Sequence, residues 1–209
     1  MQMEVRKLTV GYGAAWVLDQ VSLQIGAGEF VGIVGCTGCG KTTLLKAMAG
    51  LLEVQDGEIL LDGENIFSRR FDRAVLRRKV GMVFQYPEYQ LFEETIAKDI
   101  AFGPKNQGLS EKEIDQRVRR AMAHVHLDYD KYAERSPFDL SGGQMRRVAI
   151  AGVMAMHPRV LVLDEPTSNL DSLNEAVILK SLAEERKDKT VVLVRHRASP
   201  MRIAARTYS

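Results

Sequence analysis

The stretch that most constrains the fold is "VGIVGCTGCGKTTLL", which begins at Val31. An apolar run, "GEFVGIVG", leads into a glycine-rich loop, and the chain continues as "KTTLLKAMAGLL", with Leu44, Leu45, Met48 and Leu51 at helical spacing. The apolar run predicts a buried central strand, and the spacing after the loop predicts a helix. A glycine-rich loop between a buried strand and a helix is typical of an α/β fold that holds phosphate groups.

The loop has the spacing G-x-x-x-x-G-K-[ST] over residues 35–42. Glycines let backbone N–H groups turn toward phosphate oxygens, and the start of a helix adds a partial positive charge. We expect Lys41 to reach the β- and γ-phosphates of a nucleotide, and Thr42 to offer its hydroxyl to Mg²⁺. A chance glycine-rich turn is the alternative. The residues predicted to surround the phosphates are Gly35, Cys36, Thr37, Gly38, Cys39, Gly40, Lys41, Thr42 and Thr43.

Both cysteines of the chain lie in this loop, as the C-x-x-C pair Cys36 and Cys39. A zinc site needs about four ligands, and the four histidines fit no zinc-finger spacing. A thioredoxin-like redox pair stays open on spacing alone. Because a helix start and Lys41 lie beside it, Cys39 is a candidate reactive thiol.

A pair of acidic residues follows a second apolar run, in "RVLVLDEP". A buried strand would deliver Asp164 and Glu165 to the carboxyl edge of a parallel sheet, where ligands bind in such folds. We expect Asp164 in the Mg²⁺ shell, and Glu165 to orient or deprotonate an attacking water. An exposed turn at a strand end is the alternative.

The length of 209 residues suits a single α/β domain. Strands that alternate with helices predict a mostly parallel sheet, and the helical stretch over about residues 86–155 interrupts that alternation as an inserted lobe. Within this lobe, Ser110 and Glu113 form a capping-box pattern that predicts the start of a helix.

The composition and the apolar stretches limit the classes of protein that fit. The net charge of +2 gives no electrostatic case for nucleic acid. The N-terminus has no apolar signal region, and the apolar stretches fall far short of the ~20 residues that span a bilayer. We therefore expect a cytosolic chain.

A third motif, "LSGGQ" at residues 140–144, stands ahead of the helical stretch "MRRVAIAGVMAM". With "GCTGCGKTT" before it and "VLVLDEP" after it, the chain resembles the ATP-binding cassette (ABC) family over essentially its whole length. The resemblance implies a P-loop NTPase three-layer core, over residues 1–85 and 156–209, with a small antiparallel β section and an inserted helical lobe. It also implies an ATPase that uses ATP and Mg²⁺, with each ATP held between two cassettes.

The resemblance also assigns roles to single residues. Gln85, in "MVFQ", matches a loop that touches Mg²⁺ or water and senses a membrane partner. Asp171, in "SNLD", matches the loop that crosses the dimer seam, and His196 matches a histidine that contacts the γ-phosphate. The loop that binds the γ-phosphate of ATP held by the other subunit is matched by Ser141, Gly142, Gly143 and Gln144.

The same resemblance places an adenine-stacking aromatic residue in the N-terminal β section. Tyr12 is the candidate, and Trp16 is a rival for the role. Simple packing is the alternative for either ring.

Two stretches, residues 80–114 and 134–158, look like the ATPase subunits of energy-coupling factor (ECF) transporters, which take up vitamins and cobalt or nickel ions. The implied partners are a second cassette, identical or paralogous, a transmembrane coupling subunit and a substrate-binding membrane protein. The implied location is the cytoplasmic face of the cell membrane, and no nucleic acid is involved. Residues 86–92 would help to form the groove that receives the coupling subunit, with an ordinary amphipathic surface as the alternative.

The last stretch, from "NEAVILKSLAEE" onward, looks more like an exporter-type cassette. Arg195 stands where the family usually has Ser or Thr, Ala205 stands where Asp is common, and the chain stops shortly after His196. We expect a truncated or mosaic cassette from this pattern. The alternatives to an importer subunit are an exporter-type cassette, a soluble cassette without a transport role, and a cassette that binds ATP but hardly hydrolyses it.

Overall fold

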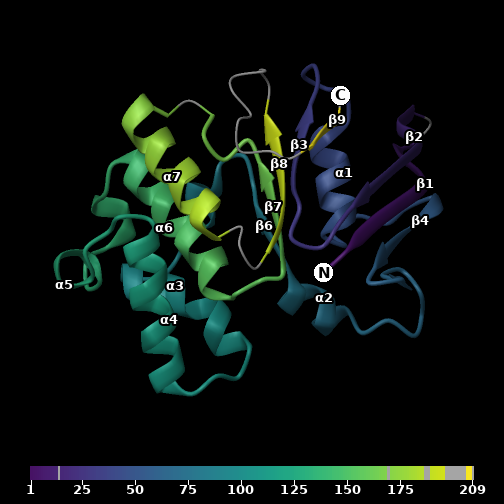
Figure 1. The fold of residues 1–209 in the computed structure, drawn as a ribbon. Helices are drawn as coiled ribbons and strands as arrows, with labels where there is room; N and C mark the ends of the chain where they lie inside the picture. Colours follow the sequence, from purple (N-terminus) through teal and green to yellow (C-terminus); the bar gives the residue numbers. More distant parts are fainter. Residues whose placement is uncertain (14, 169, 186–188, 196–205, 209) are drawn as a thin grey trace. The chain divides into compact units, whose positions relative to one another are not determined.

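The computed structural model describes residues 1–13, 15–168, 170–185, 189–195 and 206–208 (Figure 1). These residues divide into two compact units. The first holds Met1–Met82, Arg159–Glu165 and the described residues from 189 onward, and the second holds Val83–Pro158 and Pro166–Glu185. The segment Pro166–Glu185, which follows the acidic pair, therefore belongs with the helical unit.

The first unit contains two sheets. The smaller one is antiparallel, in the order β2-β1-β4-β5, and its strands are β1 (Met3–Tyr12), β2 (Ala15–Ile25), β4 (Asp56–Leu61) and β5 (Glu64–Asn65). Gly63 takes the positive φ angle that the turn between β4 and β5 requires, and Gly57 takes one within β4, where a Cβ would collide with the carbonyl oxygen of Lys7. This sheet is the antiparallel section that the sequence predicts.

The larger sheet has the order β6-β7-β8-β3-β9, and its strands are β3 (Phe30–Val34), β6 (Val80–Val83), β7 (Val160–Asp164), β8 (Thr190–Arg195) and β9 (Arg206–Tyr208). The pairs β7–β8, β8–β3 and β3–β9 are parallel. Every residue of β7 is buried, as expected of a central parallel strand with both faces covered. The helices of this unit are α1 (Lys41–Met48) and α2 (Arg73–Lys79).

The register of the parallel strands brings their carboxyl ends together. Asp164 pairs with Val194, and Val34 pairs with Arg195. The loop after β3 and the acidic residues after β7 therefore leave the sheet at the same edge.

The second unit is helical. Its elements are η1 (Pro87–Gln90), α3 (Ile96–Asn106), α4 (Glu111–His124), α5 (Tyr129–Tyr132), η2 (Pro137–Asp139), α6 (Gly142–Ala155) and α7 (Ser172–Glu185). Helix α6 packs against α3, α4 and α7. Buried Ile100, Met122 and Ile150 contribute to its core. No helix in the described part of the chain is both long and apolar enough to cross a membrane.

Candidate functional site

The loop between β3 and α1 has the backbone that its glycines predict. Gly38 and Gly40 adopt φ angles of 80° and 96°, where any side chain is strained. At Gly40 there is no room either, because a Cβ would lie 2.7 Å from Cδ2 of Leu18 and 3.1 Å from the carbonyl oxygen of Val17. The glycine therefore lets the start of β2 approach the loop closely.

Lys41, the first residue of α1, is buried against this loop. Its ammonium group donates hydrogen bonds to the carbonyl oxygens of Gly35, at 2.9 Å, and Cys36, at 2.7 Å. Because carbonyl oxygens carry no net charge, these bonds hold the ammonium in place without neutralising it. A fixed positive charge at a turn of glycine N–H groups suits an anionic ligand.

Thr42 and Asp164 connect the loop to the end of β7. The Thr42 hydroxyl donates to Oδ2 of Asp164 at 2.7 Å, and Asp164 is only 2% exposed. Hydroxyl and carboxylate oxygens are ligand types that Mg²⁺ prefers, usually completed by water and substrate phosphates. The described residues hold no cluster of three or more His, Cys, Asp or Glu residues that could bind a metal ion by itself. The pair therefore fits a magnesium ion that arrives with a phosphate ligand.

Glu165 follows immediately and has an unusual backbone. Its φ angle is 49°, and its N–H donates to the carbonyl oxygen of Val194 at 3.2 Å. A left-handed conformation outside glycine is sparsely populated and tends to occur at functional sites. No pattern in the sequence indicates this turn. Glu165, which is buried, therefore lies at the same sheet edge as Asp164.

The candidate adenine-stacking residues lie on the small sheet. Tyr12 ends β1, and its side chain lies outside the described part of the structure. Trp16 is 63% exposed near the start of β2, where its ring covers Gly11 of the neighbouring strand closely enough that a Cβ there would meet it at 2.9 Å. Val17 and Leu18, which follow Trp16 in β2, lie against Gly40. The exposed Trp16 ring therefore belongs to a strand that borders the loop of residues 35–42.

In the second unit, Ser141 begins α6 with a capping box. The backbone N–H of Gln144 donates to Oγ of Ser141 at 3.4 Å, and the N–H of Ser141 donates to Oε1 of Gln144 at 3.0 Å. The pattern S-x-x-Q carries this signal in the sequence. The same arrangement at Ser110 and Glu113 begins α4, as the sequence predicts.

Asp171 lies beside this loop and organises the start of α7. It accepts hydrogen bonds from the backbone N–H groups of Leu173 and Asn174 and from Nδ2 of Asn174. The bonds from Asn174 are the main cause that lowers the pKa of Asp171 below its ordinary value. A Cβ on Gly143 would lie 2.6 Å from Nδ2 of Asn174, so the glycine lets the two segments touch.

Arg146 is a buried cation on α6. Its guanidinium donates to both carboxylate oxygens of Glu88, at 2.8 and 3.0 Å, and to the carbonyl oxygen of Ser168. Burial works to raise the pKa of Glu88, but the hydrogen bond from Arg146 and its charge outweigh it, so this pKa is lowered. Arg146 therefore ties α6 to the segment after Gln85 and to the segment after the acidic pair.

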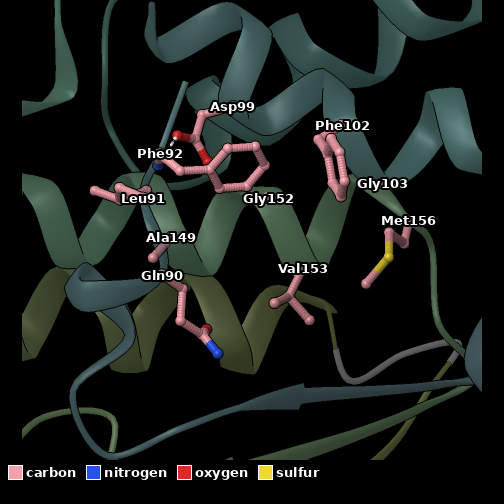
Figure 2. Close-up of a pocket in the computed structure, with 10 residues that line it drawn as sticks. All are labelled: Gln90, Leu91, Phe92, Asp99, Phe102, Gly103, Ala149, Gly152, Val153 and Met156. Atoms are coloured by element: carbon pink, nitrogen blue, oxygen red, sulfur yellow. Dashed lines mark hydrogen bonds between the residues drawn. The ribbon is translucent and has the colours of Figure 1, made fainter. Parts of the chain in front are cut away.

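An apolar pocket of about 150 Å³ lies between α3, α6 and the segment after η1 (Figure 2). The rings of Phe92 and Phe102 meet edge to face with their centres 4.9 Å apart, and both are exposed. The backbone N–H of Phe92 donates to Oδ2 of Asp99 at 2.9 Å, which fixes this segment to α3. The pocket includes part of residues 86–92, where the sequence predicts a partner groove.

The predicted residues fall in two groups. The first unit brings together the loop of residues 35–43, Asp164 and Glu165, and the second unit brings together residues 141–144 and Asp171. Gln85 lies two residues beyond the end of β6, directly after Phe84. His196 lies outside the described residues, as does Ala205.

The sequence pattern of the family described as "ABC transporter" matches residues 18–168. The chain belongs to the ABC transporter family. This family membership confirms the resemblance drawn from the three motifs, and the predicted fold class of a P-loop core with an antiparallel section and a helical lobe is confirmed as well.

Several members of the ABC transporter family resemble this chain closely. An energy-coupling factor transporter ATP-binding protein, EcfA2 of Clostridium tetani, is 54% identical over 181 residues, which are 86% of this chain and 63% of that protein. The chain thus spans less than two thirds of this relative's length. The structure of cbiO1 from Clostridium perfringens, described as part of the ABC transporter complex cbiONQ, has a TM-score of 0.87 and 34% identity, and covers 99% of this chain and 83% of its own.

A dimeric ATP-binding cassette, MJ0796, bound to ADP and Pi in a post-hydrolysis state, is also similar. Its TM-score is 0.84 at 30% identity, over 98% of this chain and 92% of its own. Within the ABC transporter family, the chain is therefore closely similar to the ECF transporter ATPases that its sequence resembles.

Proposed function

We propose that this chain binds ATP with Mg²⁺ and hydrolyses it, as the ATP-binding subunit of an ECF-type importer of a vitamin or a transition-metal ion. The observation that carries the proposal is the hydrogen bond between Thr42 and Asp164 beside Glu165. It joins a phosphate-type loop to two buried carboxyl groups at one sheet edge. That combination of groups suits hydrolysis of a nucleotide better than simple binding of an anion.

In this proposal the N–H groups of residues 35–43 and the ammonium of Lys41 hold the β- and γ-phosphates. Thr42 and Asp164 would hold Mg²⁺, with Gln85 as a further ligand, and the ion would supply positive charge to the phosphate oxygens. Glu165 orients the attacking water and accepts its proton. His196 contacts the γ-phosphate, and Tyr12, with Trp16 as its rival, stacks on the adenine.

The proposed ATP site is completed by a second cassette, identical or paralogous. Residues 141–144 of one cassette bind the γ-phosphate of ATP held by the other, and Asp171 lies at the seam. The dimeric form of MJ0796 with ADP and Pi supports this arrangement by similarity. ATP then stabilises the closed dimer and its hydrolysis releases it, which shifts the population between two states.

The membrane partners proposed for this chain are a transmembrane coupling subunit and a substrate-binding membrane protein, which would place it at the cytoplasmic face. Exposed Phe92 and Phe102, which line the apolar pocket, support docking of a coupling subunit (Figure 2). The association of cbiO1 with the complex cbiONQ supports it by similarity.

The variant Glu165→Gln tests the proposal. We expect it to bind Mg-ATP, to hydrolyse it at least about a hundredfold more slowly than the wild type, and to accumulate as an ATP-bound dimer in light scattering. Lys41→Ala is the control that should fail to bind ATP and stay monomeric. If both the wild type and Glu165→Gln bind ATP but hydrolyse it at the same low rate, the chain is a cassette that binds ATP without turnover. If neither binds ATP, the proposal is contradicted.

A further inference from the structure

The two cysteines of the chain lie on either side of one tight turn in the phosphate loop. Both Cys36 and Cys39 are exposed, and the backbone N–H of Cys39 donates to the carbonyl oxygen of Cys36 at 3.4 Å. A turn closed by this bond keeps its end Cα atoms within about 7 Å, and a disulfide needs about 4.4–6.8 Å. The backbone therefore already brings the two residues to the spacing that a disulfide requires.

The sulfur of Cys39 has two further neighbours in the loop. It lies 3.9 Å from Nζ of Lys41, and it packs against Gly35 so closely that a Cβ there would approach it to 2.8 Å. A positive charge beside a sulfur favours attack by the thiolate, which is the nucleophile in thiol–disulfide exchange. Attack on an incoming disulfide would therefore begin at Cys39.

We propose that Cys36 and Cys39 form a thiol–disulfide modification site within the phosphate loop, whose co-reactant is a low-molecular-weight disulfide such as glutathione disulfide. The Cys39 thiolate attacks one sulfur of the reagent, which forms a mixed disulfide and releases one thiolate. The Cys36 thiolate then attacks the Cys39 sulfur, which closes the protein disulfide and releases the second thiolate. The protein loses two electrons, the reagent gains them, and the two thiol protons end on the two released thiolates.

Closure changes the part of the loop that would hold phosphate. A disulfide would tie the Cys39 sulfur, which packs against Gly35, to Cys36, whose carbonyl is one of the two that fix the Lys41 ammonium. We expect the oxidised chain to bind Mg-ATP about tenfold more weakly, because one or two hydrogen bonds to a charged phosphate are misaligned. This consequence rests on the proposed function, whereas the disulfide itself does not. Since a reducing compartment keeps thiols reduced, oxidation would be a transient response there.

The first experiment treats the full reduced chain with glutathione disulfide and maps the products by mass spectrometry of proteolytic peptides. The expected product is a peptide that has lost two hydrogen atoms between Cys36 and Cys39. The variant Cys36→Ser keeps the attacking thiol and should stop at the mixed disulfide with glutathione. A wild-type chain that also stops at mixed disulfides would overturn the proposal.

The second experiment measures the binding of a fluorescent ATP analogue with Mg²⁺ to the oxidised chain, before and after dithiothreitol. The chain has no other thiols, so each sample serves as its own control. Weaker binding that dithiothreitol restores supports the proposal, and closure without a change in affinity overturns its functional part. If the reduced chain itself binds no Mg-ATP, the proposed function fails, while the peptide masses still decide whether the cysteines form the site.

Discussion

The hydroxyl of Thr42 and the carboxylate of Asp164 meet at 2.7 Å although 122 positions separate them in the sequence. Thr42 belongs to the first turn of α1, and Asp164 is the last residue of β7. The parallel register that aligns β3, β8 and β7 carries both residues to one edge of the sheet. Long-range strand pairing thus brings together two oxygen groups of the kinds that Mg²⁺ prefers as ligands.

Thr42→Val should remove this hydrogen bond while keeping the side-chain volume. We expect a loss of about 1–2 kcal/mol in the free energy of unfolding, because the buried carboxylate of Asp164 loses a donor. We also expect the stabilisation by ATP to lose its dependence on Mg²⁺, measured as the shift in melting temperature with and without EDTA. Thr42→Ser, which keeps the hydroxyl, is the matched control, and equal Mg²⁺ dependence in both variants would contradict a metal role for Thr42.

The ion pair between Arg146 and Glu88 should make stability depend on pH in the acidic range. Burial raises the pKa of Glu88, but the hydrogen bond from Arg146, a backbone hydrogen bond and the Arg146 charge together lower it below 4.5 in the folded chain. Its contribution is therefore fully present above pH 4.5 and is lost as the pH falls through the lower, folded-state pKa. Urea unfolding between about pH 6 and pH 3 should show a steeper loss for the wild type than for Glu88→Gln.

Removal of the cation from this pair should cost more than neutralisation of the carboxylate. Arg146→Met leaves the mostly buried carboxylate of Glu88 without its cation and should destabilise the chain by about 3 kcal/mol, measured at neutral pH. Glu88→Gln retains hydrogen-bonding groups and should cost about 1–2 kcal/mol. Equal, small losses in both variants would mean that solvent already screens the pair.

Gly143 and Gly142 offer a matched test of the contact between α6 and α7. A Cβ at Gly143 would lie 2.6 Å from Nδ2 of Asn174, which is itself held by Asp171, whereas a Cβ at Gly142 meets no atom within 4 Å. Gly143→Ala should cost about 1–2 kcal/mol of unfolding free energy in urea titrations, because Asn174 must move. Gly142→Ala should be neutral or slightly stabilising, as alanine is in a helix.

The same substitution should be visible at Asp171. If the methyl group that Gly143→Ala introduces displaces the side chain of Asn174, Asp171 loses the second of the two hydrogen bonds from Asn174 that lower its pKa most, and this pKa should rise toward its ordinary value of 3.8. An NMR titration of the Asp171 carboxyl carbon measures this shift. An unchanged pKa in Gly143→Ala would show that Asn174 keeps its bonds and that the contact with Gly143 relaxes elsewhere.

Local patterns carry most of what can be predicted from the sequence. The apolar runs before Gly35 and Asp164 indicate buried parallel strands, and a sheet of this kind must bring the ends of its strands to one edge. The capping box at Ser110 is likewise predicted and confirmed, since it depends on residues three apart. The capping box at Ser141 has the same spacing, with Gln144 three residues later. It is not predicted, because the same residues form the LSGGQ motif and are interpreted as a ligand-binding loop.

Long-range relationships escape prediction from the sequence, because no local period encodes them. Arg146 and Glu88 are 58 positions apart, and only the folding of the helical unit makes them a pair. The left-handed backbone of Glu165 also has no local cause, since a glutamate disfavours that conformation and the hydrogen bond to Val194 depends on the neighbouring strand. Such features must be read from the structure, and they fall close to the motifs that the sequence does reveal.

The apolar pocket should be needed for assembly with a membrane partner and not for the stability of the chain. Phe102→Ser removes one of the two rings that meet at its rim, and Phe138→Ser is the matched control, an exposed ring that does not line the pocket. Because Phe102 and Phe138 are 44% and 60% exposed, both variants should fold with losses of at most about 1 kcal/mol. Only Phe102→Ser should lose co-purification with a co-expressed transmembrane coupling subunit of an ECF transporter after extraction in detergent. If both variants assemble as the wild type does, the coupling subunit docks elsewhere, and the pocket is only an irregularity in the packing of α3 on α6.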